Sequence, residues 1–237
     1  MNKPEQLAKM IDHTILHPTA TDEDLKKECA VAKKYQVASM CVKPYMVPDT
    51  VRLLEGSGVA VGCVIGFPAG NSVTDVKVFE AERACQDGAK EVDMVINVAR
   101  ALEGDWDYVA KEITAVAEAC HRHDALLKVI FETDYITEEA DIVRLCEICT
   151  EAQADYVKTS TGFGFVKGDD GKYSYTGATV PTLKLMKKSI GPNVKVKASG
   201  GIRTLDALLA VREVGCARCG ATATVAILEE AKRRFGR

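Results

Sequence analysis

The segment Asp155-Tyr156-Val157-Lys158-Thr159-Ser160-Thr161-Gly162 begins as a short apolar strand and ends in a turn. Side chains alternate between the two faces of a strand, which puts Tyr156 and Lys158 on one face and Val157 and Thr159 on the other. If Val157 packs under a covering helix, Lys158 points into the space that the sheet encloses. A lysine there is costly unless it is paired or used, because burial disfavours its charged form.

The pattern of a strand followed by a helix recurs about eight times along the chain, as in closed barrels of this size. We expect strands at Met10–Ile15, Val37–Val42, Val59–Ile65, Glu91–Asn97, Leu126–Phe131, Asp155–Thr159, Val194–Ala198 and Ala217–Gly220. We expect helices at Pro4–Met10, Thr21–Tyr35, Pro48–Glu55, Thr74–Gln86, Asp105–Arg122, Thr137–Ala152, Ala178–Ser189, Leu205–Val214 and Thr222–Arg233.

This order predicts the α/β class and a (β/α)8 TIM barrel with a short N-terminal helix. A doubly wound open sheet is the alternative. It would usually need fewer strands and a Gly-x-Gly-x-x-Gly motif after the first strand, where none is found. With no linker or low-complexity segment, we expect residues 1–237 to form a single barrel domain.

The composition argues for a protein that acts on small molecules. Hydrophobic residues make up 47% of the 237 residues, which is enough for a sizeable core, and the net charge is −3. That charge argues against a nucleic-acid or membrane-surface partner. No apolar run reaches spanning length, and Met1–Met10 is charged rather than signal-like, so a cytoplasmic location is expected.

The nine cysteines raise the question of a metal site. Without a secretion signal they should be reduced thiols. Two Cys-x-x-Cys pairs, Cys146/Cys149 and Cys216/Cys219, make a shared zinc site an alternative. The first pair lies in a helical pattern, where this spacing simply puts both residues on one face. Buried, unreactive thiols are therefore the default expectation, and we expect no metal and no cofactor.

Alternation sends further charged side chains into the same interior. Asp93, Lys128 and Lys197 join Lys158, with Lys195 deeper or partly solvated. A buried ion-pair network would explain one carboxylate and one lysine, but not the surplus of lysines. Crowded ammonium groups lower one another's pKa, and desolvation lowers the pKa of each. Because Schiff-base chemistry requires a free amine, the pattern predicts a nucleophilic lysine, a second lysine that keeps it neutral, and a carboxylate that moves protons.

The flanking residues place this chemistry at the carboxyl-terminal rim of the barrel. Lys158 and Lys197 are each followed by small, loop-forming residues, and the active sites of such barrels lie at that rim. Gly200-Gly201 and Gly220-Ala221-Thr222 predict a phosphate cradle, because glycines and a helix N-terminus present N–H groups to an oxyanion. Ordinary loop closure is the alternative, but beside the lysines a phosphorylated carbonyl substrate is the better interpretation.

The motifs around these residues resemble one enzyme family. Asp93 lies in Glu-Val-Asp-Met-Val, Lys158 in Val-Lys-Thr-Ser-Thr-Gly-Phe, and Lys197 in Val-Lys-Ala-Ser-Gly-Gly-Ile-Arg. With Ile11-Asp12-His13-Thr14 and with Cys41 before Lys43-Pro44, they are similar to the deoxyribose-phosphate aldolases, which need no metal. The likeness runs over nearly the whole chain, and the two lysine motifs are specific.

The resemblance implies reversible cleavage of 2-deoxy-D-ribose 5-phosphate to D-glyceraldehyde 3-phosphate and acetaldehyde, a step of deoxyribonucleotide and carbohydrate degradation. It implies that Lys158 forms the Schiff base, that Lys197 lowers the pKa of Lys158, and that Asp93 moves protons through water. The implied substrate-pocket residues are Asp12, Thr14, Cys41, Lys128 and Thr159. The implied phosphate-binding residues are Gly162, Gly200, Gly201, Gly220 and Thr222.

Three features depart from the family pattern. Thr222-Ala223 stands where many members carry paired serines, so one hydroxyl is lost and phosphate affinity is expected to be weaker. The chain stops at Gly236-Arg237 without the terminal tyrosine that some members have. The segment Val166–Tyr175, with a predicted hairpin turn at Asp169-Asp170-Gly171, is longer than the usual loop. It is expected to be a lid, a subunit contact or a harmless surface insertion.

Other functions remain open from the sequence. A different Schiff-base lyase, with transaldolase-like chemistry on another sugar phosphate or keto acid, is one alternative, and a barrel that binds a phosphorylated ligand without turnover is another. A metal-dependent aldolase fits poorly, because His121 and His123 precede the fifth strand and lie at the opposite end of the barrel, while His13 and His17 form no evident ligand set. The expected partners are a small phosphorylated sugar and an aldehyde, in a homodimer or higher homo-oligomer.

Overall fold

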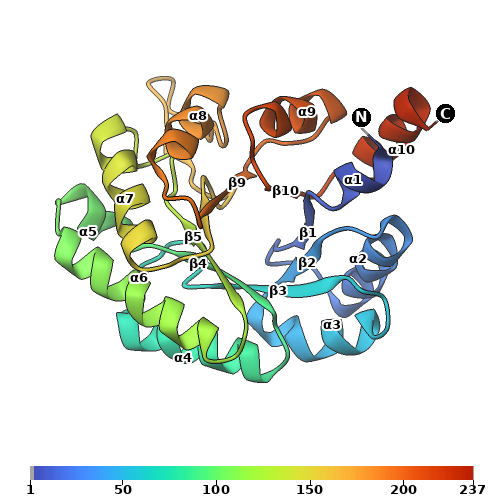
Figure 1. Ribbon diagram of the computed structural model, residues 1–237, viewed down its shortest axis with the longest axis horizontal. Coiled ribbons are helices and arrows are strands. Elements are labelled where there is room, and N and C mark those ends of the chain that lie inside the picture. The colour runs from blue at the N-terminus through green and yellow to red at the C-terminus, as the bar shows by residue number, and fades with distance from the viewer. Residues whose placement is uncertain (1–2, 237) are drawn as a thin grey trace.

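The computed structural model describes residues 3–236; Met1, Asn2 and Arg237, at the ends of the predicted N-terminal segment and of the chain, lie outside the described residues. Within residues 3–236, eight parallel strands close into a barrel in the order β1-β10-β9-β6-β5-β4-β3-β2. Helices surround these strands, which confirms the predicted (β/α)8 barrel (Figure 1). The barrel strands are β1 (Ile11–Ile15), β2 (Ser39–Val42), β3 (Ala60–Ile65), β4 (Glu91–Val95), β5 (Leu126–Ile130), β6 (Tyr156–Lys158), β9 (Lys195–Ser199) and β10 (Arg218–Ala221).

The helices follow the predicted order, with small shifts at their ends. They are α1 (Pro4–Ala8), α2 (Asp22–Tyr35), α3 (Val47–Leu54), α4 (Thr74–Gln86), α5 (Val98–Leu102), α6 (Trp106–His121), α7 (Glu139–Glu151), α8 (Val180–Ser189), α9 (Leu205–Glu213) and α10 (Thr224–Phe235). The prediction missed α5 and a 3-10 turn at Pro44–Met46. Both are too short to show helical periodicity, and α5 is marked only by its N-cap, Asn97, whose side chain accepts a hydrogen bond from the Arg100 N–H.

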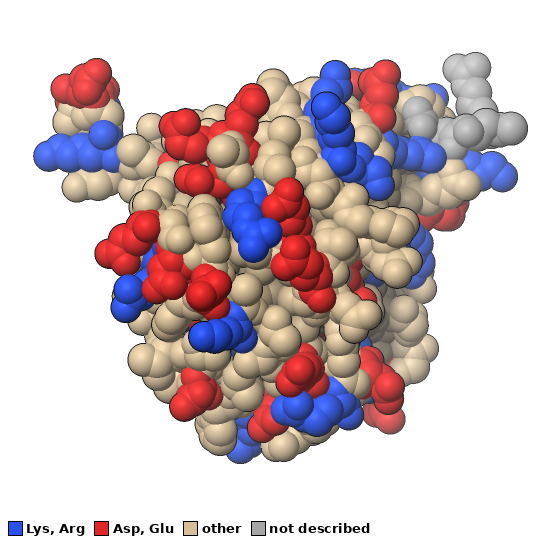
Figure 2. All heavy atoms as spheres, turned by 60° about the vertical axis from the view of Figure 1, so that its left-hand side comes forward, with Lys and Arg blue, Asp and Glu red and all other residues tan. Residues whose placement is uncertain are grey.

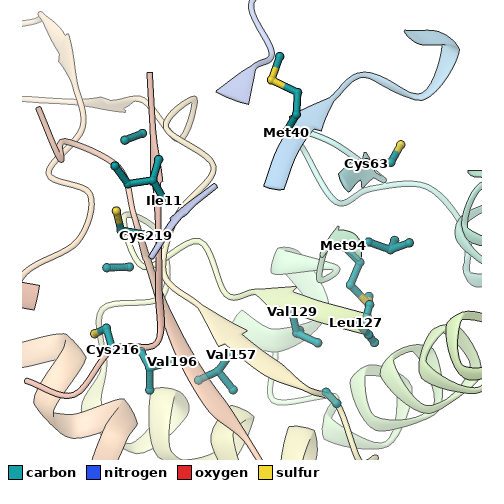
Figure 3. Packing of buried hydrophobic residues seen from close by; sticks show 14 of the residues in the cluster. Ile11, Met40, Cys63, Met94, Leu127, Val129, Val157, Val196, Cys216 and Cys219 are labelled. Carbon is teal, nitrogen blue, oxygen red and sulfur yellow. The ribbon is translucent and has the colours of Figure 1, made fainter. Parts of the chain in front are cut away.

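Hydrophobic residues fill the layer between the barrel and its helices. The outward-facing residues of adjacent strands, among them Met94, Leu127, Val129, Val157 and Val196, are fully buried there (Figure 3). Each such side chain contributes about 1.5–3 kcal/mol when it leaves water. The outward face of each strand is apolar because it packs in this layer. The inward face takes no part in this packing and can carry charged side chains.

The strand register places the charged inward residues side by side. Asp93 of β4 pairs with Lys128 of β5, and Lys158 of β6 pairs with Lys197 of β9. All four side chains are buried. The register therefore confirms that alternation sends these residues into one interior, as the sequence predicted. Lys195, at the start of β9, is exposed and lies over the ring of Tyr156.

The longer loop after β6 forms a two-stranded hairpin that stands outside the barrel. β7 (Val166–Lys167) pairs antiparallel with β8 (Tyr173–Ser174), and the Gly171 N–H donates to the Gly168 carbonyl across the predicted turn. Residues 165–174 are exposed.

The face in Figure 2 carries acidic and basic side chains mixed together. It shows no broad basic surface, in keeping with the small negative net charge. No helix of residues 3–236 is long and apolar enough to cross a membrane.

Candidate active site

Lys158 lies in a chain of ion pairs that fills the centre of the barrel. Its Nζ is 2.7 Å from Asp93 Oδ2, and the same oxygen is 2.7 Å from Nζ of Lys197. Lys197 Nζ also lies 2.6 Å from Asp12 Oδ2. Lys128 Nζ contacts three carboxylates, one from β1 and two from β4: Asp12 at 2.8 Å, Glu91 at 2.5 Å and Asp93 at 3.3 Å.

Arg218 closes the cluster from β10, at the side of the barrel opposite β4. Its guanidinium lies 2.5 Å from Asp12 Oδ1 and 2.9 Å from Glu91 Oε1. The cluster therefore holds three carboxylates and four basic side chains. Buried charges that are not balanced are costly, so one of the four basic groups is expected to give up its proton.

Lys158 is the basic group of the cluster whose protonated form is least stabilised by carboxylates. It contacts one carboxylate, Asp93, and shares that oxygen with Lys197, whereas Lys197 contacts two carboxylates and Lys128 three. Burial lowers the pKa of Lys158 and the charge of Lys197 lowers it further, against the opposing effect of Asp93. With Lys158 neutral, three cations face three carboxylates. Burial, rather than the neighbouring cation emphasised in the sequence analysis, is the larger cause.

The pKa values of Lys197 and Asp93 are displaced toward their charged forms. Burial also acts to lower the pKa of Lys197, but Asp12 and Asp93 together outweigh it and raise that pKa. Burial alone would raise the pKa of Asp93, yet Lys128, Lys158 and Lys197 hold it well below its usual range. The pKa of Lys158 is thus lowered and that of the neighbouring Lys197 is raised. Perturbed pKa values of this kind are typical of sites that perform acid–base or nucleophilic chemistry.

Two members of this cluster, Glu91 and Arg218, were not predicted from the sequence. Glu91 alternates with Asp93 and could have been placed inward from the same signal. Arg218 begins a strand of four residues, too short for alternation to be read. Asp12 was expected at the substrate pocket through the family resemblance. In the structure it lies beneath the pocket, fully buried among the lysines.

A cavity of about 230 Å³ opens above Lys158 at the carboxyl-terminal rim. Pockets that bind drug-sized ligands have volumes of roughly 300–1,000 Å³, so this cavity suits a smaller metabolite. Lys158 is the one lysine of the cluster among its described lining residues, and those residues include no Asp or Glu. The amine with the lowered pKa is therefore the one that a ligand can reach. The cavity is lined by Thr14, Leu16, His17, Lys158, Thr161, Gly162, Phe163, Tyr175, Ser199, Gly200, Gly201, Ile202, Arg203, Gly220, Ala221 and Thr222.

The predicted binding residues divide into two groups. The five residues expected to bind the phosphate all line the cavity: Gly162, Gly200, Gly201, Gly220 and Thr222. Thr14 of β1, expected in the substrate pocket, lines it as well. Lys128 and Cys41 are buried with the ion pairs below it. Thr159 is buried on the outward side of β6, where its hydroxyl donates to the Ser199 carbonyl. Thr159 supports the wall rather than forming it.

A buried carboxylate that the sequence analysis did not single out holds the loop after β6. Glu132 follows β5, is 1% exposed, and accepts hydrogen bonds from the N–H and the hydroxyl of Thr161. Burial raises the pKa of Glu132. Gly164 lies so close that a Cβ there would be 2.7 Å from the Glu132 carboxyl carbon. Glu132 thus fixes Thr161 and Gly162 at the cavity wall.

The cysteines and histidines do not assemble into a ligand set. All nine cysteines are free and buried. Within residues 3–236 no group of three or more His, Cys, Asp or Glu side chains could hold a metal ion. His121 lies 3.0 Å from Asp155, which precedes β6, and His13 is buried between Glu28 and Thr224.

Comparison with known proteins identifies the family to which the chain belongs. The family model of the DeoC/LacD family aldolases matches residues 6–225. The chain belongs to this family of aldolases. A deoxyribose-phosphate aldolase of Rhodopirellula baltica is 46% identical over 97% of this chain and 91% of the relative. One of Thermococcus gammatolerans is 47% identical over 95% and 96%.

Solved structures of the DeoC/LacD aldolases share the fold. The deoxyribose phosphate aldolase from Aeropyrum pernix, described as a unique tetrameric structure, superposes with a TM-score of 0.86 and 28% identity. The match covers 100% of this chain and 94% of the other. The charged cluster and the cavity therefore lie in a barrel that this aldolase family uses.

Proposed function

We propose that the protein is an aldehyde-lyase that reversibly cleaves 2-deoxy-D-ribose 5-phosphate to D-glyceraldehyde 3-phosphate and acetaldehyde through a Schiff base on Lys158. The observation that carries this proposal is the position of Lys158: it is the cluster lysine with the lowered pKa and the one that lines the cavity. The named relatives support the choice of substrate.

The proposed reaction needs no electron acceptor other than the imine itself. The neutral Lys158 amine attacks the aldehyde carbon of the open-chain sugar, and the carbinolamine takes up one proton from solvent and loses water to give an iminium ion. Removal of the proton from the C3 hydroxyl breaks the C2–C3 bond and releases glyceraldehyde 3-phosphate. The electron pair moves to the iminium nitrogen as an enamine. Protonation of the enamine carbon and hydrolysis then release acetaldehyde and return the amine.

Lys197 and Asp93 are proposed to control charge and protons in this sequence. Lys197 lies at the same level of the barrel as Lys158 and keeps its own proton. It disfavours protonation of Lys158 before the reaction. Asp93 contacts both lysines through Oδ2, while Oδ1 makes no hydrogen bond among the described residues. That oxygen lies 3.3 Å from Nζ of Lys128, and Asp93 is proposed to relay a proton through water during carbon–carbon cleavage.

The glycines of the rim are proposed to hold the phosphate group. Gly162, Gly200 and Gly201 have positive φ values of 84°, 95° and 80°, which only glycine adopts freely. Gly220 and Thr222 complete the wall just before α10, whose N-terminus favours an anion. Phosphate bound here would place the aldehyde end of the sugar toward Lys158.

The direct test is cleavage of 2-deoxy-D-ribose 5-phosphate, with glyceraldehyde 3-phosphate and acetaldehyde measured separately. Lys158→Ala should abolish turnover, because it removes the nucleophile. Lys195→Met is the matched control: it changes a lysine of β9 that is exposed at the other end of the barrel, and it should retain activity. Full activity in Lys158→Ala would exclude the proposed mechanism, and an inactive wild type would exclude the proposed substrate.

We also propose that the protein forms a homo-oligomer and works in the cytoplasm. The oligomer is supported by the tetrameric relative from Aeropyrum pernix and by the frequency of symmetric oligomers among soluble proteins. Light scattering coupled to size-exclusion chromatography tests the assembly; a mass near 25.6 kDa at micromolar concentration would contradict it.

A further inference from the structure

The hairpin β7–β8 returns to the barrel at the edge of the cavity. Phe165 leaves the barrel, the hairpin follows, and Tyr175 is the first residue after it to line the cavity wall. The rings of Phe165 and Tyr175 meet edge to face, with centroids 5.5 Å apart and an interplanar angle of 87°. This contact closes the base of the hairpin, so the position of Tyr175 depends on both of its limbs.

The segment after Tyr175 is fixed to the loop that follows β9. Asp134 Oδ1 accepts hydrogen bonds from the N–H groups of Thr176, at 2.5 Å, and Gly177, at 2.9 Å. Gly177 has a φ of +72°, and a Cβ there would lie 2.6 Å from the Gly200 carbonyl oxygen. The Ala178 N–H donates to the same carbonyl at 3.1 Å. The inserted segment is thereby held against a loop of the cavity wall.

Tyr175 contacts a cation that faces the same cavity. Nη2 of Arg203 donates to the Tyr175 hydroxyl at 3.0 Å, and both residues line the wall formed by Gly200 and Gly201. Arg203 makes no ion pair with any carboxylate of the described residues. Because the Tyr175 oxygen accepts from Arg203, its own O–H hydrogen remains available to donate.

We propose that the hairpin insertion completes the phosphate subsite: Tyr175 orients the Arg203 guanidinium and donates its own hydrogen bond to a phosphate oxygen. The ligand class is a phosphate monoester, whose oxygens accept both a guanidinium and a phenol hydrogen. This inference rests on the proposed function for the identity of the substrate, but the subsite itself is a binding site for phosphate. Tyr175 is thus a specificity-determining residue that favours phosphorylated over unphosphorylated aldehydes.

Tyr175→Phe tests this, because it removes only the hydroxyl and keeps the ring that packs on Phe165. The matched control is Tyr173→Phe, on the same hairpin but 66% exposed. Losing a hydrogen bond to a charged group is expected to raise KM for 2-deoxy-D-ribose 5-phosphate about tenfold in Tyr175→Phe, with kcat nearly unchanged. The value of kcat/KM for unphosphorylated 2-deoxy-D-ribose should stay at the wild-type value, and Tyr173→Phe should match wild type for both substrates.

Calorimetric titration with inorganic phosphate separates this inference from the proposed function. Wild type and Tyr173→Phe should bind phosphate equally, and Tyr175→Phe about tenfold more weakly. An active wild type with unchanged KM and phosphate affinity in Tyr175→Phe would overturn the inference alone. So would an equal loss on both sugars. An inactive wild type whose phosphate affinity falls in Tyr175→Phe would overturn the proposed function and support the subsite.

Discussion

Replacing Lys197 with methionine removes one cation from the buried cluster and should restore the proton of Lys158. In the wild type, four basic groups face three carboxylates, and Lys158 has the fewest carboxylate contacts. After Lys197→Met, three cations would balance Asp12, Glu91 and Asp93 with Lys158 protonated. The pKa of Lys158 should therefore rise.

The size of this rise follows from the geometry. The Nζ atoms of Lys158 and Lys197 are each 2.7 Å from Asp93 Oδ2, so they are at most twice that distance, 5.4 Å, apart. Two unit charges at this separation repel by about 3 kcal/mol at an effective dielectric constant of about 20. That energy corresponds to about two pKa units. At any pH well below the wild-type pKa of Lys158, its uncharged fraction should fall roughly 100-fold.

The assay is the pH dependence of kcat/KM, together with the rate at which cyanoborohydride traps acetaldehyde on the protein. A neutral amine is the reactive form, so both rates increase as pH rises through the pKa of Lys158. Lys197→Met should move this acidic limb about two pH units upward. Lys195→Met, two residues earlier on β9, should leave it in place. A limb that does not move in Lys197→Met, or that moves equally in both variants, would refute the charge-balance argument.

Other perturbations test the remaining parts of the account. Glu132→Ala removes the hydrogen bonds to Thr161 at the cavity wall and should raise KM more than it lowers kcat in steady-state kinetics. Glu132→Gln keeps the hydrogen bond to the Thr161 hydroxyl and should recover most of the loss. Equal effects of the two variants would contradict the proposed role of Glu132 in holding the cavity wall. Lys77 and Glu112 form a fully buried ion pair at 2.7 Å between α4 and α6. Lys77→Met leaves the Glu112 carboxylate buried without its partner and should lower the free energy of unfolding, measured by urea titration, by about 3–5 kcal/mol. The double variant Lys77→Met/Glu112→Leu should restore most of this free energy. Incubation with EDTA should leave the rate of cleavage unchanged, because no step uses a metal; loss of activity that Zn²⁺ restores would contradict this.

Strand periodicity was enough to predict the barrel and the inward direction of its central lysines. Alternation depends on each strand alone, so it placed Lys158, Lys197 and Asp93 correctly in the interior. It could not say which side chains meet across a closed barrel. Arg218 and Glu91 are 127 residues apart and come together only because β1 and β10 close the sheet. The balance of charge around Lys158 is a property of that closure.

The cavity wall was less predictable for a different reason. Glu132 follows its strand at a φ of 57°, outside any periodic pattern, and its partner Thr161 lies in the next loop. The hairpin turn at Asp169-Asp170-Gly171 could be predicted from local turn chemistry, but not the contact between Tyr175 and Arg203. Loop contacts of this kind depend on how two segments pack in space, and single-sequence patterns carry little information about that.

The most direct measurement is to identify the lysine that forms the imine. The protein would be incubated with acetaldehyde and sodium borohydride, digested, and its peptides sequenced by mass spectrometry. The account predicts a two-carbon adduct, stoichiometric with the chain, on the Nζ of Lys158. An adduct on Lys197 or Lys128 instead, or no adduct in a protein that cleaves deoxyribose 5-phosphate, would contradict it.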